Sequence, residues 1–227
     1  NSTALGFSGG FTGAYINSFL KSKEIQTDFI EVAGLTRINV FTQVRQPKSE
    51  YKLVNKGPNI SAEEVRSLLK QIEEIPPESY LCISGSLPQG VAPEIIDEIS
   101  AVSARNNIHL ILDTSYANVL NCLAHRPFLL KPKEEELAEW FGRETLTFQE
   151  CVGYGQRLVA EGARHVLVSL GGEGGLYISK DQVLYGNAPK GKVVNTACAG
   201  DTLLGSFTGN LLKGRPTEEN LKFSLAA

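Results

Sequence analysis

Short apolar runs alternate with amphipathic helical segments from residue 80 onward, and this alternation constrains the fold more than any other feature of the sequence. The pattern is typical of a parallel sheet whose faces are covered by helices, and runs that are apolar throughout suit strands buried on both faces. The predicted strands are 80–84, 109–112, 128–130 and 165–170, and the predicted helices are 61–75, 93–106, 134–141 and 148–161.

The segment 28–55 shows a different pattern. Three apolar runs, 29–32, 36–44 and 51–54, follow one another with polar connections and no helical segment between them. We therefore expect consecutive strands that form a small sheet apart from the main layer. A second hairpin is predicted for 175–179 and 183–185, and Ser61 and Glu64 have the spacing of a capping box at the start of the first predicted helix.

Composition limits the classes of function. The chain has 227 residues with 42% hydrophobic content, which favours one main domain. Its formal net charge of −3 comes from basic and acidic residues spread along the chain, so we expect no nucleic-acid partner. No apolar stretch approaches the roughly 20 residues that span a bilayer, and no signal peptide is evident. We expect a cytoplasmic protein with no membrane partner.

The cysteines and histidines indicate no metal site. The four cysteines are widely and irregularly spaced, which fits neither a zinc site nor a disulfide scaffold, so we expect reduced thiols. The three histidines stand alone along the sequence and are assigned no chemistry. Because the chain contains no methionine and opens with Asn1, we expect that a segment upstream is missing.

The window 193–207 carries the strongest chemical signal. Two small residues, Ala199 and Gly200, precede Asp201 where an apolar run gives way to a helical pattern. The start of a helix exposes unpaired N–H groups and the positive end of the dipole, so a phosphate could approach this backbone closely. Asp201 would then suit a base that takes a proton from an attacking hydroxyl. On this window alone, an Asp201 that only caps the helix is an equal alternative.

The same window resembles the second signature of the phosphofructokinase-B branch of the ribokinase family, whose usual form is Asp or Asn, Thr, any residue, Gly, Ala, Gly, Asp. Six further segments resemble the family in its order. The matches are Asn195, Thr196, Ala199, Gly200 and Asp201, with GLTRINV at 34–40, NKGP at 55–58, SGSLPQG at 84–90, DTS at 113–115, KPKEEEL at 131–137 and VSLGGEG at 168–174.

The resemblance implies a fold and a domain organisation. The expected fold is a ribokinase-like three-layer α/β/α arrangement with a mostly parallel central sheet, to which residues 28–55 add a small β lid. One kinase domain would span residues 1–227, incomplete at both ends, and the absent start would carry the family's glycine-rich sugar-binding motif. An exposed lid sheet also favours a homodimer through the lid.

The resemblance implies a site for ATP and Mg²⁺. By position, Lys131 matches a lysine near the ATP phosphates, and Glu136 matches a glutamate that organises magnesium indirectly, through water. A glycine-rich turn after a parallel strand also suits nucleotide binding, although alone it could be a simple tight turn. The further nucleotide residues implied are Ser169, Gly171 and Gly174.

Two residues depart from the family pattern. Lys133 stands where the family keeps an asparagine, which places a cation where a neutral amide would help to organise magnesium. Cys198 replaces the usual glycine before Ala199, which is a milder change because the side chain is small.

The acceptor site is implied by another part of the resemblance. Arg37 is expected to bind the phosphate already on the sugar, because a guanidinium matches a phosphate dianion. Asn39 lies two residues further along the predicted strand, where it would share a face with Arg37. Ser86 is a second candidate in the loop 84–90. The alternative for Arg37 is a solvent-facing strand charge.

The first choice of reaction is ATP-dependent phosphorylation of fructose 1-phosphate to fructose 1,6-bisphosphate, since 34–40 and 55–58 look closest to the 1-phosphofructokinases. Tagatose-6-phosphate kinase is the nearest alternative enzyme. From another class, Lys133 and Cys198 permit a catalytically weakened regulator that binds sugar phosphate. An NAD-dependent dehydrogenase is disfavoured, because no GxGxxG turn follows a first strand.

Overall fold

The computed structural model describes residues 2–44, 49–193 and 195–227, in two compact units. The first unit comprises Asn1–Glu74 and Leu87–Ile95, and the second comprises Ile75–Ser86 and Ile96–Ala227. That one kinase domain spans the whole chain stays a prediction.

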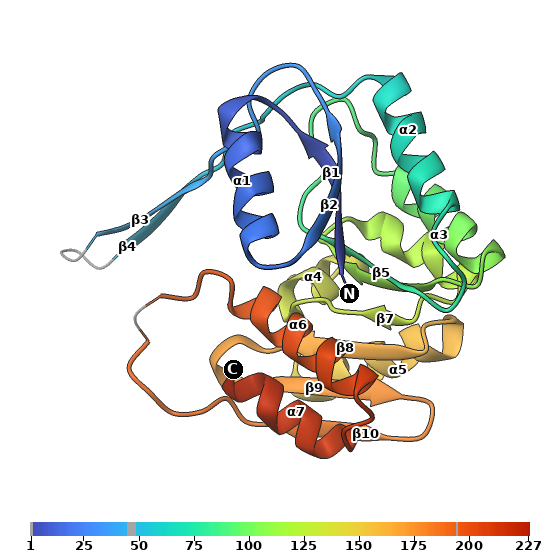
Figure 1. Ribbon diagram of the computed structural model, residues 1–227. Coiled ribbons are helices and arrows are strands. Elements are labelled where there is room, and N and C mark those ends of the chain that lie inside the picture. Colours follow the sequence, from blue (N-terminus) through green and yellow to red (C-terminus); the bar gives the residue numbers. More distant parts are fainter. Residues whose placement is uncertain (1, 45–48, 194) are drawn as a thin grey trace. The chain divides into compact units, whose positions relative to one another are not determined.

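The first unit contains a parallel β-α-β arrangement that the sequence patterns did not predict. Strand β1 (Thr3–Ser8) is followed by helix α1 (Gly10–Ser22), and strand β2 (Gln26–Glu31) pairs parallel to β1. Figure 1 shows α1 beside these two strands. The prediction that 29–32 belongs to the lid sheet was therefore wrong, because β2 takes its hydrogen bonds from β1.

The segment expected to form the lid contains a hairpin of two strands. Strand β3 (Val40–Val44) pairs antiparallel with β4 (Ser49–Leu53), and in Figure 1 the pair extends away from β1, β2 and α1. The predicted strand 36–44 begins late, because Thr36 bonds instead to the turn before α1: its N–H donates to the carbonyl of Gly9 over 3.0 Å, and its Oγ1 accepts the N–H of Gly9. Residues 45–48 of the predicted lid segment 28–55 lie outside the described residues.

Helix α2 (Ala62–Glu73) confirms the predicted capping box. The Ser61 hydroxyl accepts the N–H of Glu64, and a carboxylate oxygen of Glu64 accepts the N–H of Ser61 over 2.6 Å. These two bonds satisfy donors that the helix itself cannot reach.

The second unit is built on a six-stranded sheet in the order β10-β9-β8-β7-β6-β5. Strands β5, β6, β7 and β8 pair parallel to one another, and β9 pairs antiparallel with both β8 and β10. This arrangement confirms the mostly parallel sheet and the late hairpin. Their bounds are β5 (Tyr80–Ser84), β6 (His109–Asp113), β7 (Leu129–Leu130), β8 (His165–Ser169), β9 (Gly175–Ser179) and β10 (Val183–Gly186).

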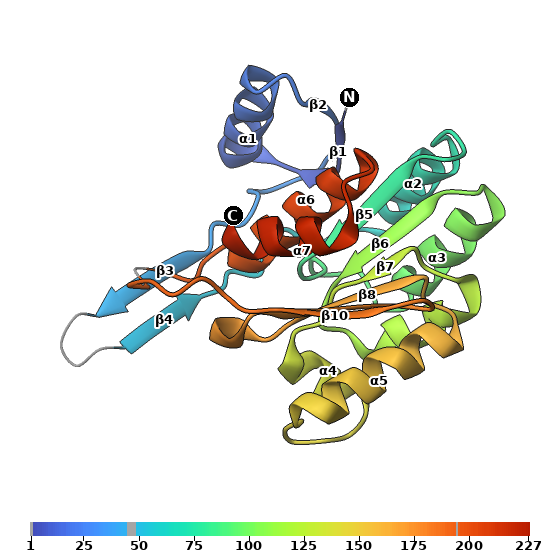
Figure 2. The same cartoon turned by 90° about the horizontal axis from the view of Figure 1, so that it is seen from below.

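Helices cover both faces of this sheet. Figure 2 shows α4 and α5 on one side and α6 and α7 on the other. Phe207 of α6 packs with Tyr177 of β9 in the buried core. The helices are α3 (Ile95–Arg105), α4 (Glu134–Trp140), α5 (Phe148–Glu161), α6 (Ala199–Leu212) and α7 (Thr217–Ala226), with 3-10 turns η1 (Ala117–His125) and η2 (Gly171–Glu173).

One strand corrects the sequence analysis. Strands β6 and β8 are buried on both faces as expected, but β5 exposes every second residue: Tyr80, Cys82 and Ser84. Successive side chains of a strand point to opposite faces, so one face of β5 is exposed.

Among the residues that the structure describes, every helix is too short or too polar to cross a membrane.

Candidate active site

The carboxyl ends of four parallel strands bring polar side chains together in the second unit. Ser84 ends β5, Asp113 ends β6, Lys131 follows β7 and Ser169 ends β8. Backbone bonds hold their register, since the N–H of Lys131 donates to the carbonyl of Leu112 over 2.9 Å. In α/β sheets this edge is where ligands bind.

Lys131 and Asp113 form a buried ion pair at this edge. The Lys131 Nζ lies 3.0 Å from Oδ1 of Asp113, and the two side chains are 1% and 13% exposed. The hydroxyl of Ser84 lies 3.4 Å from Oδ2 of the same carboxylate. Such a pair holds a cation in the protein interior that would otherwise be costly to bury.

The start of α6 faces the same ammonium group. A Cβ atom built on Gly200 would lie 3.4 Å from Nζ of Lys131. The first amides of a helix lack intrahelical acceptors and attract anions. The lysine and the helix start therefore combine two positive features at one place, as a phosphate-binding site requires.

The loop before α6 contains a non-glycine residue in the left-handed backbone conformation. Cys198 has φ +62° and ψ +6°, the left-handed conformation that favours glycine. Its carbonyl accepts both the N–H and the hydroxyl of Thr202, and the Asn195 side chain accepts the N–H of Ala197 over 2.7 Å. These bonds order the turn that leads to Asp201, whose carboxylate is exposed in the first turn of the helix.

The pKa of the Cys82 thiol depends on its burial and on the charges around it. The atoms packed around its sulfur, and then the carboxylates of Asp113 and Asp201, raise the pKa of the thiol to about 11, while Lys131 acts in the opposite direction. The thiol is therefore neutral at physiological pH, although part of the residue meets solvent. Asp113, Asp201 and Lys131 thus act on the same small region.

The residues matched to nucleotide binding also lie in the second unit. Lys133 pairs with Ser169 in a short parallel bridge, and the N–H of Lys133 donates to a carboxylate oxygen of Glu136 over 2.9 Å at the start of α4. Gly171 opens the 3-10 turn after β8 and has φ +54°. Gly174, with φ +112°, leaves no room for a side chain, because a Cβ would meet the carbonyl of Gly186.

The residues matched to the acceptor site divide between the units. Arg37 and Asn39 lie in the first unit, before β3, so their predicted place on a strand was wrong. The side chain of Arg37 packs against Gly57, where a Cβ would lie 3.2 Å away, and the side-chain amide of Asn55 donates to the carbonyl of Ile38. The segments 34–40 and 55–58 are thus neighbours. Ser86 belongs to the second unit.

Sequence reasoning assigned no role to Asp113 or Cys82. The signal for Asp113 was available, because the DTS segment follows an apolar run directly and the ends of parallel strands share one edge. Cys82 lies inside a strand, where the sequence alone does not show which neighbours it meets.

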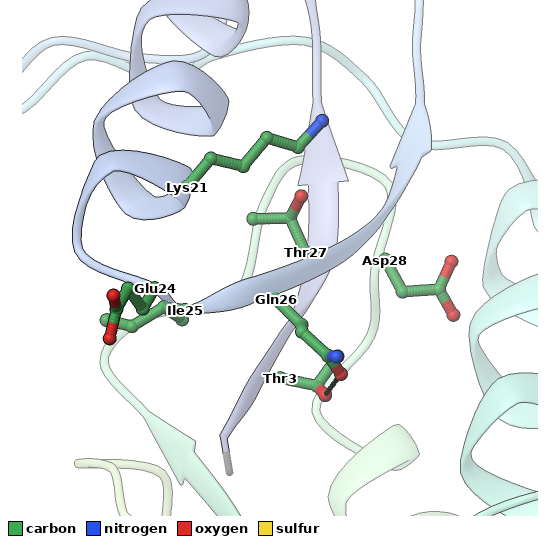
Figure 3. A pocket seen from close by; sticks show the side chains of 7 residues that line it. All are labelled: Thr3, Lys21, Glu24, Ile25, Gln26, Thr27 and Asp28. Atoms are coloured by element: carbon green, nitrogen blue, oxygen red, sulfur yellow. Dashed lines mark hydrogen bonds between the residues drawn. The ribbon is translucent and has the colours of Figure 1, made fainter.

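A surface hollow in the first unit involves other residues. It has a volume of about 620 Å³ and lies where α1 ends and β2 begins, beside the start of β1. Figure 3 shows Thr3 and Gln26 facing each other across a hydrogen bond there. None of the residues matched to catalysis, nucleotide or acceptor lines it.

Comparisons with known proteins agree with this geometry. The family model described as pfkB family carbohydrate kinase matches residues 1–227. A protein of Bacillus licheniformis named D-tagatose-1-phosphate kinase is 45% identical, with 100% of this chain and 74% of that protein covered. A protein of Bacillus subtilis named 1-phosphofructokinase is 36% identical over the same shares. Phosphofructokinase-2 from Escherichia coli, solved in complex with substrates and products, has a TM-score of 0.91 at 30% identity, covering 98% of this chain and 73% of that one.

Proposed function

Because the chain belongs to the pfkB family of carbohydrate kinases, we propose that it transfers the γ-phosphoryl group of ATP to a ketohexose phosphate, with fructose 1-phosphate as the first choice of acceptor. The observation that carries the proposal is the position of the Lys131 ammonium beside Gly200 at the start of α6. A buried cation and free helix amides together suit the negative charge of a transferring phosphoryl group.

The proposed reaction assigns the proton and the leaving group. The C6 hydroxyl of fructose 1-phosphate attacks the γ-phosphorus, and Asp201 takes the hydroxyl proton as the new phosphorus–oxygen bond forms. The bond from the γ-phosphorus to the bridging oxygen breaks, so ADP leaves and fructose 1,6-bisphosphate remains. The amides of Ala199 and Gly200, with Lys131, stabilise the charge that spreads over the phosphoryl oxygens.

Nucleotide binding is assigned to the loop after β8. Ser169, Gly171 and Gly174 would cradle the nucleotide, since this loop opens at the carboxyl edge of the sheet. The residues also fit hydrated Mg²⁺, because Glu136 uses one carboxylate oxygen at the start of α4 and magnesium usually keeps several waters. Bound through water and the ATP phosphates, Mg²⁺ would neutralise phosphate charge.

Recognition of the acceptor is assigned to Arg37, Asn39 and Ser86. Arg37 would bind the phosphate already on the sugar through charge-assisted hydrogen bonds. Asn39 and Ser86 would contact the sugar hydroxyls.

Tagatose 1-phosphate is a second candidate acceptor. The relative named D-tagatose-1-phosphate kinase is more similar to this chain than the relative named 1-phosphofructokinase, at 45% against 36% identity. Both names describe a ketohexose that carries its phosphate on C1, so they favour a 1-phosphate over a 6-phosphate acceptor.

The test is release of ADP in a coupled assay with fructose 1-phosphate, tagatose 1-phosphate, fructose 6-phosphate and tagatose 6-phosphate. We expect kcat/KM for at least one 1-phosphate to exceed that for either 6-phosphate by about tenfold or more, because a phosphate at the other end of the sugar cannot make the charge-assisted bonds proposed for Arg37. Preference for tagatose 6-phosphate would support the alternative kinase. Tight binding of a sugar phosphate without ADP release would instead support a regulator.

The assembly and location form part of the same proposal. The hairpin β3–β4 exposes apolar side chains, including Phe41, Tyr51 and Leu53, which supports self-association through the lid. The four free thiols favour a reducing compartment such as the cytoplasm. Replacing Phe41 and Leu53 together by serine should turn a dimer into a monomer in sedimentation velocity.

A further inference from the structure

We propose that Asp113 is a positioning residue: it keeps Lys131 protonated and holds the ammonium group beside the first turn of α6. This inference rests on the proposed contact of Lys131 with the ATP phosphates and extends it to a residue without an assigned role. The observations that carry it are the 3.0 Å ion pair and the close approach of Nζ to Gly200.

Burial makes a counter-charge necessary. The side chain of Lys131 is 1% exposed. Removal from water disfavours the charged form of a lysine, and the positive end of the α6 dipole lies beside the same nitrogen. Without a nearby anion, both effects would destabilise the charged ammonium form, and a neutral amine cannot stabilise a phosphoryl group.

Among the described residues, Asp113 at the end of β6 forms an ion pair with Lys131, and the thiol of Cys82 on β5 is influenced by Lys131, Asp113 and Asp201 of α6. Cys82 cannot supply the charge, because burial raises the pKa of its thiol to about 11. Asp201 is exposed and is proposed to accept a proton in each turnover. Within the described part of the chain, Asp113 is the carboxylate that forms the ion pair with Lys131.

Asp113 is held in place by the neighbouring strand. Its backbone carbonyl accepts the N–H of Gly85 over 2.9 Å, and its carboxylate accepts a hydrogen bond from the Ser84 hydroxyl over 3.4 Å. The carboxylate is also largely buried. A fixed, desolvated carboxylate keeps its partner charged more effectively than a mobile surface group.

The consequence is a change in pH dependence when the charge is removed. Asp113→Asn keeps the shape of the side chain but removes the anion, so Lys131 should lose its proton at lower pH. We expect the alkaline limb of kcat/KM for ATP to move down by about one pH unit or more. The affinity for ADP should weaken over the same pH range, and this readout does not depend on turnover.

The experiment measures pH profiles of kcat/KM and of ADP affinity for wild type, Asp113→Asn and the control Asp97→Asn. Asp97 lies 3.3 Å from Nε2 of His125, in the same unit and partly exposed, so its variant should keep both wild-type profiles. Adding Lys131→Arg to Asp113→Asn should restore the alkaline limb to that of Lys131→Arg alone, because arginine stays protonated.

The outcomes separate this inference from the proposed site. Wild-type turnover in Lys131→Met would remove Lys131 from the site and with it the basis of the inference. Loss of turnover in Lys131→Met, with unchanged pH profiles in a folded Asp113→Asn protein, would overturn the positioning role alone. If Asp113→Asn does not fold, Asp113→Ser replaces it, because serine also removes the anion: an alkaline limb that moves to lower pH supports the role, and an unmoved limb contradicts it.

Discussion

The Nζ of Lys131 lies 3.4 Å from the point that a Cβ on Gly200 would occupy. A methyl group there would fit without displacing the lysine, but it would fill space through which a phosphate reaches the amides. Gly200→Ala should therefore lower kcat/KM for ATP by about tenfold to a hundredfold while the protein stays folded. Gly209→Ala in the same helix is the matched control, since its Cβ would meet open space. Equal activity in the two variants would contradict the phosphate-binding role of the α6 start.

Lys133 is exposed at the start of α4, and its backbone N–H is bonded to Glu136. If its ammonium contacts ATP phosphate, Lys133→Asn should raise the Michaelis constant for ATP and change the magnesium dependence. Asparagine also caps a helix better than lysine, so the same variant should increase the free energy of unfolding by roughly 0.5–1 kcal/mol and unfold at a higher temperature. Steady-state kinetics over a range of Mg²⁺, with Lys180→Asn as control, separate the two effects. If Lys133→Asn increases stability but leaves the kinetics unchanged, Lys133 takes no part in ATP binding.

Arg37 is predicted to bind the phosphate on the acceptor. Losing a charge-assisted bond costs about 1.5–3 kcal/mol, so Arg37→Ala should raise the Michaelis constant for the sugar phosphate roughly ten- to 150-fold. The Michaelis constant for ATP should stay nearly unchanged, and the preference of the enzyme for the sugar phosphate over free fructose should decrease. Arg66→Ala, an exposed arginine on α2 of the same unit, serves as the control. An equal loss toward phosphorylated and free sugar would assign Arg37 to the fold of the first unit.

His165 predicts how stability depends on pH. Its Nδ1 lies 2.7 Å from the hydroxyl of Tyr177, and burial followed by the charge of Arg164 lowers its pKa from the ordinary 6.5. Between the lowered value and 6.5 the unfolded chain binds more protons, so stability increases with pH there and is lost as pH falls below 6.5. The slope from this group is at most about 1.4 kcal/mol per pH unit.

Urea unfolding of wild type and His165→Gln from about pH 8 to about pH 5 measures this contribution. The difference in stability between the two proteins should shrink toward acid, since only the wild type must release a proton from this position on folding. A constant difference over the range would show that His165 does not titrate with folding.

The sequence predicted the second unit well because its strands and helices have strong, regular periodicity. Helix α5 and strand β9 have the predicted bounds. It missed β1 and α1 because glycines and polar residues interrupt their apolar pattern. It treated Cys198 as a question of side-chain size, whereas the structure shows a backbone with φ +62°, a conformation for which glycine is the usual residue. The pairing of Asp113 with Lys131 depends on strand order, which local patterns do not encode.

Asp201 carries the central claim, because it lies in the first turn of α6 next to the proposed phosphate site. Asp201→Asn keeps the shape of the side chain and removes the base, so single-turnover phosphorylation of fructose 1-phosphate should slow by at least about a hundredfold. ATP affinity, measured by calorimetry on the same protein, should stay within about threefold of wild type. Near wild-type turnover in Asp201→Asn would contradict the account.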